Sequence, residues 1–145
     1  MTVAPEKIGG DFVISQKQLQ YNLGLKKRDA VVIRTMPNTM DKKVRKYSHT
    51  NPPYLLEEAA VFLKEKGIKH LLIDLPSVDK EKDDGQLLAH KAFWNFEGKA
   101  RMGSTITELI YVDNTIEDGT YLLNLQVAPF ENDASPSRPV LYQIQ

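Results

Sequence analysis

The sequence contains no cysteine among its 145 residues, which excludes disulfides, thiolate nucleophiles and cysteine-based zinc sites. Its 19 basic and 19 acidic residues balance, so no global field favours nucleic acid or an anionic membrane. No apolar run approaches the roughly 20 residues that span a bilayer, and the N-terminal residues lack the apolar segment of a secretory signal. We therefore expect no nucleic-acid or membrane partner, and the cytoplasm is the default location.

Several motifs that would fix a chemistry are also missing. There is no Gly-x-Ser-x-Gly elbow, no glycine-rich phosphate loop and no His-Glu-x-x-His. The three histidines are too scattered for an all-histidine site, and we interpret His49 and His70 as incidental. The basic runs 26–28 and 42–46 could contact a phosphate, but we interpret both as solvated surface.

The residues that are present favour one α/β domain covering residues 1–145. The length and a hydrophobic content of 41% suffice for a core. Ser15 followed by Gln18 is a capping-box pattern for a helix start, and Gly24 is a natural stop. An amphipathic apolar stripe predicts a second helix over residues 55–66.

A continuously apolar run at 30–33 and a second segment at 68–75, which contains its own apolar run, flank that second helix and predict a parallel pair of buried strands. Functional groups in such sheets gather beyond the carboxyl ends of the strands. Around this pair we expect a short strand at 12–14, an ordered loop at 51–54, a helix at 87–94, strands at 106–112, 121–128 and 140–144, and a loop at 132–139.

Polar residues lie at and just beyond the end of the second segment, namely Asp74, Ser77 and Asp79, with His90 and Glu108 in later segments. Imidazole and carboxylate are ligands that zinc and manganese accept, so this order suits half of a metal site. Other interpretations of the same residues stay open. The two aspartates and the serine fit turn chemistry, His90 fits a partly buried helix position, and Glu108 points inward or outward with even odds.

Several segments together resemble the cyclase family of metal-dependent hydrolases, the group that contains kynurenine formamidase (arylformamidase). The likeness runs from about residue 10 to residue 142. It is carried by Ile33-Arg-Thr-Met-Pro-Asn38, Tyr47, Thr50-Asn-Pro-Pro-Tyr54, Gly67 to Asp79, Leu88-Ala-His90-Lys, Ile106-Thr-Glu108-Leu and Leu123 to Phe130.

The resemblance implies a swivelling β/β/α fold with a mixed sheet. It also implies hydrolysis of an amide or formamide by metal-activated water, with zinc or manganese as cofactor. The family's later metal ligands map to His90 and Glu108. Its early motif, His-x-Gly-Thr-His, does not occur in this sequence. We therefore expect the chain to correspond to the C-terminal part of the family's domain and to need an N-terminal segment for activity.

The remaining roles are hypotheses from the local residues, since the rigid Asn51-Pro-Pro-Tyr54 loop positions an aromatic ring and a Pro-Ser turn lies between the two aspartates. Tyr54 would line the substrate mouth, whereas Asp74, Ser77 and Asp79 would organise the loop at the strand end; the catalytic residues stay unassigned. The expected partners are a small-molecule amide and either further copies of the chain, as in a dimer, or a complementary N-terminal chain. The alternative hypothesis is a non-catalytic interaction module that pairs with a complementary chain through exposed sheet edges.

Overall fold

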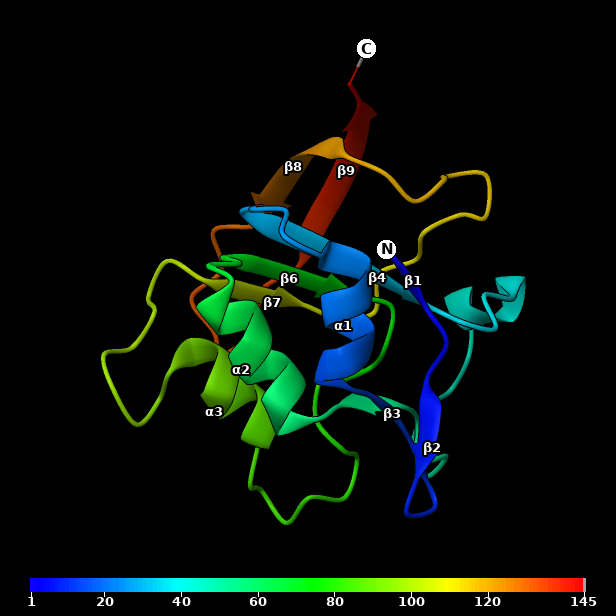
Figure 1. Cartoon of the computed structure of the whole chain (residues 1–145), viewed down its shortest axis with the longest axis vertical. Coiled ribbons are helices and arrows are strands. Elements are labelled where there is room, and N and C mark those ends of the chain that lie inside the picture. Colours follow the sequence, from blue (N-terminus) through cyan, green and yellow to red (C-terminus); the bar gives the residue numbers. More distant parts are fainter. Residues whose placement is uncertain (145) are drawn as a thin grey trace.

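The computed structural model describes residues 1–144 and is built around a four-stranded parallel sheet in the order β1-β4-β6-β7 (Figure 1). These strands are β1 (Thr2–Val3), β4 (Ala30–Thr35), β6 (His70–Ile73) and β7 (Thr105–Thr107). Ala30 lies opposite His70, and Ile33 lies opposite Ile73. The predicted parallel pair is therefore confirmed, because both apolar runs are buried side by side.

Three helices lie together on one side of this sheet (Figure 1): α1 (Gln16–Leu23), α2 (Glu57–Glu65) and α3 (Leu88–Trp94). Each contributes at least one fully buried side chain to the core, namely Leu19, Leu63 and Phe93. The predicted start of α1 is confirmed, since the Gln18 side chain accepts the backbone N–H of Ser15 at 3.2 Å.

A smaller sheet is mixed, as predicted. It contains β2 (Glu6–Ile8), β3 (Asp11–Ile14) and β5 (Tyr54–Leu55), with β2 antiparallel and β5 parallel to β3. The expected loop at 51–54 therefore ends in a short strand, because Tyr54 pairs with Val13. A short 3-10 helix, η1 (Met40–Lys43), follows β4.

The last two strands, β8 (Tyr121–Val127) and β9 (Ser137–Gln143), form an antiparallel hairpin on the side of the main sheet away from the helices (Figure 1). None of the hairpin residues is fully buried. The predicted loop at 132–139 is wrong over its last three residues. Ser137 pairs with Val127, and Pro139 is tolerated because a two-stranded hairpin consists only of edge strands.

The predicted strand at 106–112 is also wrong over most of its length. It ends at Thr107, and Leu109 takes a left-handed backbone conformation with φ of 55°. The backbone N–H of Leu109 donates to the carbonyl of Leu75 at 2.9 Å, which turns the chain toward the end of β6. This turn brings Glu108 close to the loop that follows β6.

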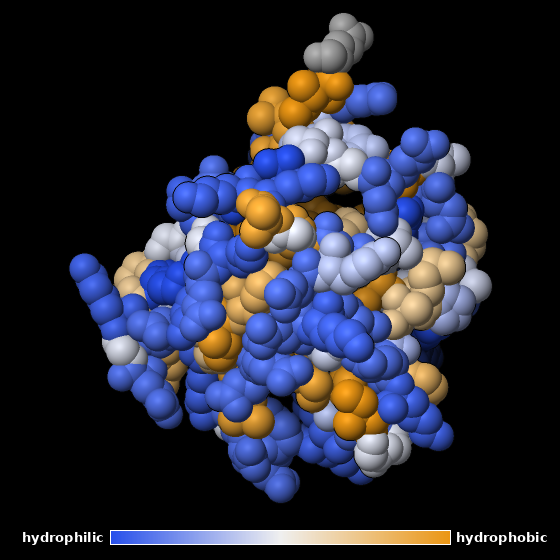
Figure 2. Space-filling model, in the orientation of Figure 1, coloured by the Kyte–Doolittle hydropathy of each residue, from blue (hydrophilic) through white to orange (hydrophobic). Residues whose placement is uncertain are grey.

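The surface on the face shown in Figure 2 is mainly hydrophilic, with apolar residues scattered across it. None of the helices in residues 1–144 combines the length and the apolar character needed to cross a membrane.

Candidate metal centre

Two polar clusters form beyond the carboxyl end of β6, and the first is closed to solvent. The Asp74 carboxylate accepts the backbone N–H of Thr35 at 2.9 and 3.0 Å and the Thr35 hydroxyl at 2.9 Å. Lys42 completes the cluster with an ion pair of 2.8 Å to Asp74. The two charged side chains are only 6% and 0% exposed, so this cluster fastens η1 to the ends of β4 and β6.

This arrangement corrects the interpretation of the basic run 42–46 as solvated surface. The side chain of Lys42 is buried, and its ammonium donates to the Thr35 carbonyl at 2.6 Å as well as to Asp74. The remaining residues of the run are exposed, as predicted. A buried carboxylate beyond β6 explains the exception, because a lysine is rarely buried unless it is paired.

The second cluster joins the loop after β6 to α3. Asp79 accepts the backbone N–H of Ala89 at 2.6 Å, and its other carboxylate oxygen lies 2.5 Å from Nδ1 of His90. A carboxylate only accepts hydrogen bonds, so Nδ1 carries the proton. When the imidazole is neutral, Nε2 therefore has a free lone pair.

Glu108 lies on the Nε2 side of that imidazole. Its Oε1 is 3.6 Å from Nε2 of His90 and accepts the backbone N–H of Val78 at 2.8 Å. The two side chains remain 18% and 28% exposed, so the gap between them is accessible from outside. The structure thus brings the two predicted metal ligands together and orients each with a second contact.

Electrostatics couple the three groups. Burial alone would lower the pKa of His90, but the hydrogen bond to Asp79 and the negative charges of Glu108 and Asp79 outweigh it and raise that pKa. Burial would raise the pKa of Asp79, yet its hydrogen bonds to His90 and Ala89 lower it overall. Burial raises the pKa of Glu108 against the opposing hydrogen bond from Val78.

The donor set can be compared with what a divalent ion requires. Two ligands that each lie about 2.1 Å from a tetrahedral ion are about 3.4 Å apart, close to the observed 3.6 Å. A carboxylate on the far nitrogen of a ligating histidine is the usual outer contact of a metal site. Within residues 1–144, however, no group of three potential ligands converges. The residues present fit part of a metal site.

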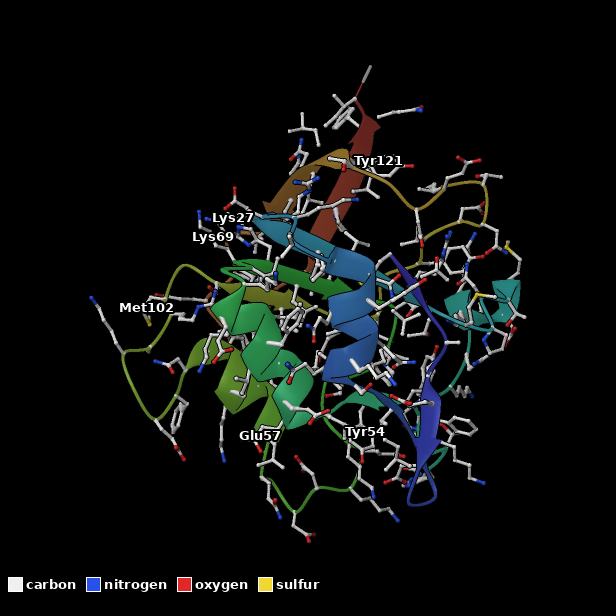
Figure 3. All side chains as sticks on the ribbon, viewed as in Figure 1. Lys27, Tyr54, Glu57, Lys69, Met102 and Tyr121 are labelled. Atoms are coloured by element: carbon white, nitrogen blue, oxygen red, sulfur yellow. The ribbon has the colours of Figure 1, made fainter. Side chains whose placement is uncertain are left out.

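The other predicted residues lie beside this cluster, and the Ser77 side chain also contacts the Glu108 carboxylate. The Ser77 hydroxyl accepts the backbone N–H of Asp79 at 3.1 Å. The Tyr54 hydroxyl donates to Asp11 at 3.1 Å, and the tyrosine lines a surface hollow together with Glu57, Asp79 and other residues. Figure 3 shows Tyr54 and Glu57 in the half of the molecule away from the hairpin.

The two remaining histidines lie outside the cluster. Nδ1 of His70 is 3.0 Å from the Thr105 hydroxyl between β6 and β7, and His49 is exposed.

Sequence reasoning missed two contacts that organise this region. Asp79 was assigned to the loop alone, although it also holds the imidazole of His90. Lys42 was assigned to the surface, although it is the partner of Asp74. No spacing in the sequence reveals either pair. The one available signal was that a carboxylate expected at the buried end of a strand must have a partner.

Together, the parallel sheet and the His90–Asp79–Glu108 cluster define an α/β chain that carries a solvent-accessible group of one imidazole and two carboxylates beyond the end of β6. The family described as putative cyclase matches residues 2–80, which is more than half of the chain. The chain therefore belongs to the cyclase family, and the resemblance noted from the sequence is confirmed.

Individual relatives agree with this membership. The chain is 33% identical over 132 residues to a kynurenine formamidase of Bacillus cereus, which covers 90% of this chain and 57% of that protein. It is 35% identical over 92 residues to a kynurenine formamidase of Bacillus mycoides, which covers 63% of this chain and 41% of the relative. The chain thus spans roughly half of the length of these curated relatives.

Solved structures confirm the fold. One is described as a predicted metal-dependent hydrolase from Bacillus stearothermophilus, with a TM-score of 0.65 and 19% identity over 97% of this chain and 60% of the other. A potential metal-dependent hydrolase with cyclase activity gives a TM-score of 0.66 and 18% identity over 97% and 62% of the two chains. The predicted cyclase-like α/β fold with mixed sheets is therefore confirmed.

Proposed function

We propose that this chain forms part of a metal-dependent hydrolase that cleaves an amide or formamide bond, with His90 and Glu108 as ligands of a zinc or manganese ion. The observation that carries the proposal is the convergence of His90 Nε2 and Glu108 Oε1 at 3.6 Å, with Asp79 bound to the opposite ring nitrogen. The kynurenine formamidase relatives support a formamide as the class of substrate.

Each residue of the cluster has a definite task in this proposal. Asp79 holds the proton on Nδ1 of His90 and keeps Nε2 aimed toward Glu108. The Val78 backbone N–H fixes one oxygen of Glu108. A divalent ion, when bound, would supply Lewis acidity that polarises a carbonyl and lowers the pKa of water. Tyr54, from the surface hollow that it shares with Asp79, would contact the substrate.

A catalytic zinc site has three protein ligands, and this cluster offers two. We therefore propose that activity needs a further ligand from a complementary N-terminal segment or from a second copy of the chain. A cytoplasmic location and a dimeric state stay predictions. Proton binding to His90 competes with metal binding, so metal affinity is expected to rise with pH.

Calorimetric zinc titration of the purified chain tests the ligand assignment. We expect Glu108→Gln and His90→Asn to weaken zinc binding at least tenfold, because each removes a donor from the ion. Glu65→Gln and His49→Asn are matched controls, since both residues are exposed and lie outside the cluster. Equal zinc affinity in the wild type, the two ligand variants and the two controls would contradict the ligand assignment. Formamide hydrolysis is then assayed with and without an added His-x-Gly-Thr-His segment.

The second candidate is an interaction module that pairs with a complementary chain. The β8–β9 hairpin supports it, because isolated two-stranded hairpins are marginally stable and this one exposes Leu122 and Tyr142. Sedimentation of the purified chain distinguishes the two ideas. A chain that binds zinc, whether as a monomer or as a dimer, favours the hydrolase portion, and an oligomer that binds no zinc favours the module.

A further inference from the structure

A hollow of about 250 Å³ is lined by the end of α1, by β4, by the segment before β8 and by the β8–β9 hairpin. Among residues 1–144, those that line this hollow do not include His90, Asp79 or Glu108. Pockets for drug-sized ligands measure roughly 300–1,000 Å³, so a hollow of this size suits a smaller molecule. It is a second place where the chain can bind a ligand, separate from the candidate metal ligands.

The inner surface of the hollow is apolar because a helix, a strand and the hairpin all contribute aliphatic side chains. Leu23 of α1 and Val31 of β4 line it and are only 7% and 5% exposed. Leu123 and Leu141 line it from the hairpin, where they lie opposite one another across the two strands. Side chains alternate along a strand, so Leu122 points to the other face and is 63% exposed. A short hydrocarbon chain can therefore be buried among the four lining residues.

Two exposed cations lie at the rim of the hollow. Lys26 and Arg28 belong to the loop between α1 and β4, and both line the hollow. Arg28 donates to the Lys27 carbonyl at 2.8 Å and to the Thr120 hydroxyl at 3.1 Å. A guanidinium has five N–H groups, so Arg28 keeps donors for a ligand.

The other charged side chains of the lining oppose these cations only in part. Arg34 pairs with Asp118 at 3.4 Å, and its other N–H groups donate to Thr2 and to backbone carbonyls. The second carboxylate of the lining, Glu117, is exposed. Two exposed cations and one exposed carboxylate leave the rim with one net positive charge, which favours a singly charged anion.

We infer that this hollow is a binding site for a small amphipathic carboxylate. Its charged group lies at Lys26 and Arg28, and its hydrocarbon part lies between α1, β4 and the hairpin. A carboxylate suits the rim because ammonium and guanidinium groups both donate charge-assisted hydrogen bonds to it. The site uses none of the candidate metal ligands, so it stands or falls independently of the proposed hydrolase function.

Nuclear magnetic resonance titration of the 145-residue chain with sodium hexanoate is the first test. We expect the backbone amide resonances of Lys26 and Tyr121, which both line the hollow, to shift together while that of His90 stays in place. Each buried CH₂ group tightens binding about fourfold, so acetate is expected to bind about tenfold or more weakly than hexanoate. 1-Hexanol lacks the charge and is also expected to bind more weakly. Equal affinity of hexanoate and either comparison compound overturns the inference.

Charge variants test the rim, and the two expected changes have opposite signs. Arg28→Gln is expected to raise the Kd of hexanoate about two- to fivefold, because it removes an exposed cation that pairs with the carboxylate. Glu117→Gln is expected to lower that Kd, because it removes the opposing negative charge. Arg138→Gln is the matched control, since Arg138 is exposed in β9 and is not among the residues that line the hollow. A hexanoate affinity that Arg28→Gln leaves at the control value overturns the inference.

A filling variant tests the apolar part. Leu141→Trp places a larger side chain in the hollow and is expected to abolish hexanoate binding. Tyr142→Trp is the control, because Tyr142 is the next residue of β9 and is 51% exposed. Undiminished hexanoate binding by Leu141→Trp overturns the inference. Sedimentation of the same proteins identifies another occupant: a wild-type dimer that Leu141→Trp converts to a monomer makes the hollow an interface between copies, and the carboxylate site is then wrong.

Discussion

Two carboxylates that follow the same strand have opposite surroundings. Asp74 is sealed in a cluster with Thr35 and Lys42, and its side chain is 0% exposed. Asp79 accepts a hydrogen bond from Nδ1 of His90, so Nε2 of the same ring faces Glu108. Solvent reaches the space between Nε2 and Glu108. The polar atoms of the first cluster are satisfied by one another, whereas the second cluster leaves Nε2 of His90 beside a carboxylate in a place that solvent reaches. Two carboxylates that follow one strand thus differ in their partners and exposure, although both lie at the strand's end in the sequence.

The largest expected effect comes from breaking the closed cluster. Lys42→Met leaves the buried Asp74 carboxylate without its cation, and removing one partner of a buried pair costs about 3–5 kcal/mol. Urea denaturation of the variant and the wild type measures the change in free energy of unfolding. Lys46→Met is the control, since Lys46 is exposed and belongs to the same basic run. A Lys42 variant as stable as this control would contradict the closed-cluster interpretation.

Removing the Asp79 charge from the second cluster is expected to change the stability less than Lys42→Met does. It is expected to weaken metal binding strongly. Asp79→Asn removes the charge that holds the Nδ1 proton of His90, and loss of such outer contacts lowers metal affinity about 10- to 100-fold. Calorimetric zinc titration measures this change. Asp84→Asn is the matched control, because Asp84 is exposed and asparagine tolerates its φ of 54°. Unchanged zinc affinity in Asp79→Asn would show that the aspartate has no part in a metal site.

The smallest effect is expected at a third carboxylate, Asp11, which accepts hydrogen bonds from several side chains but is more exposed than Asp74 or Asp79. Hydrogen bonds from Lys80, Asn51 and Tyr54 lower the pKa of Asp11 from 3.8 to about 2. A lowered folded-state pKa stabilises the fold above the unfolded value, and this stabilisation is lost as pH falls from about 4 toward about 2.

Thermal melts between pH 2 and pH 5 for the wild type and Asp11→Asn test this sign. The wild type should be the more stable protein at pH 5, and the difference should shrink as the pH falls, because Asp11 becomes protonated in both states. A difference that stays constant across this range would show that the carboxylate charge does not contribute.

Much of the fold could be predicted from local sequence patterns. Ser15 and Gln18 predicted the start of α1 because a capping box depends only on neighbouring residues. The segments at 30–33 and 68–75 predicted the parallel pair because strands buried on both faces are rich in successive apolar residues, here 30–33 and 71–73. Local patterns also predicted a strand at 106–112, which is too long because β7 ends at Thr107. The turn at Leu109 depends on a hydrogen bond to Leu75, a residue far away in the sequence.

The candidate site was likewise predictable only in part. The sequence by itself offered His90 and Glu108 as side chains of the right chemistry and Asp74 and Asp79 as residues at a strand end. Only the tertiary structure decided that Asp79 holds His90, that Lys42 neutralises Asp74, and that Trp94 lies on the imidazole. The physical reason is that hydrogen bonds and ion pairs act over a few ångströms in space. Partners far apart in the chain come within that range only after the sheet and helices have packed.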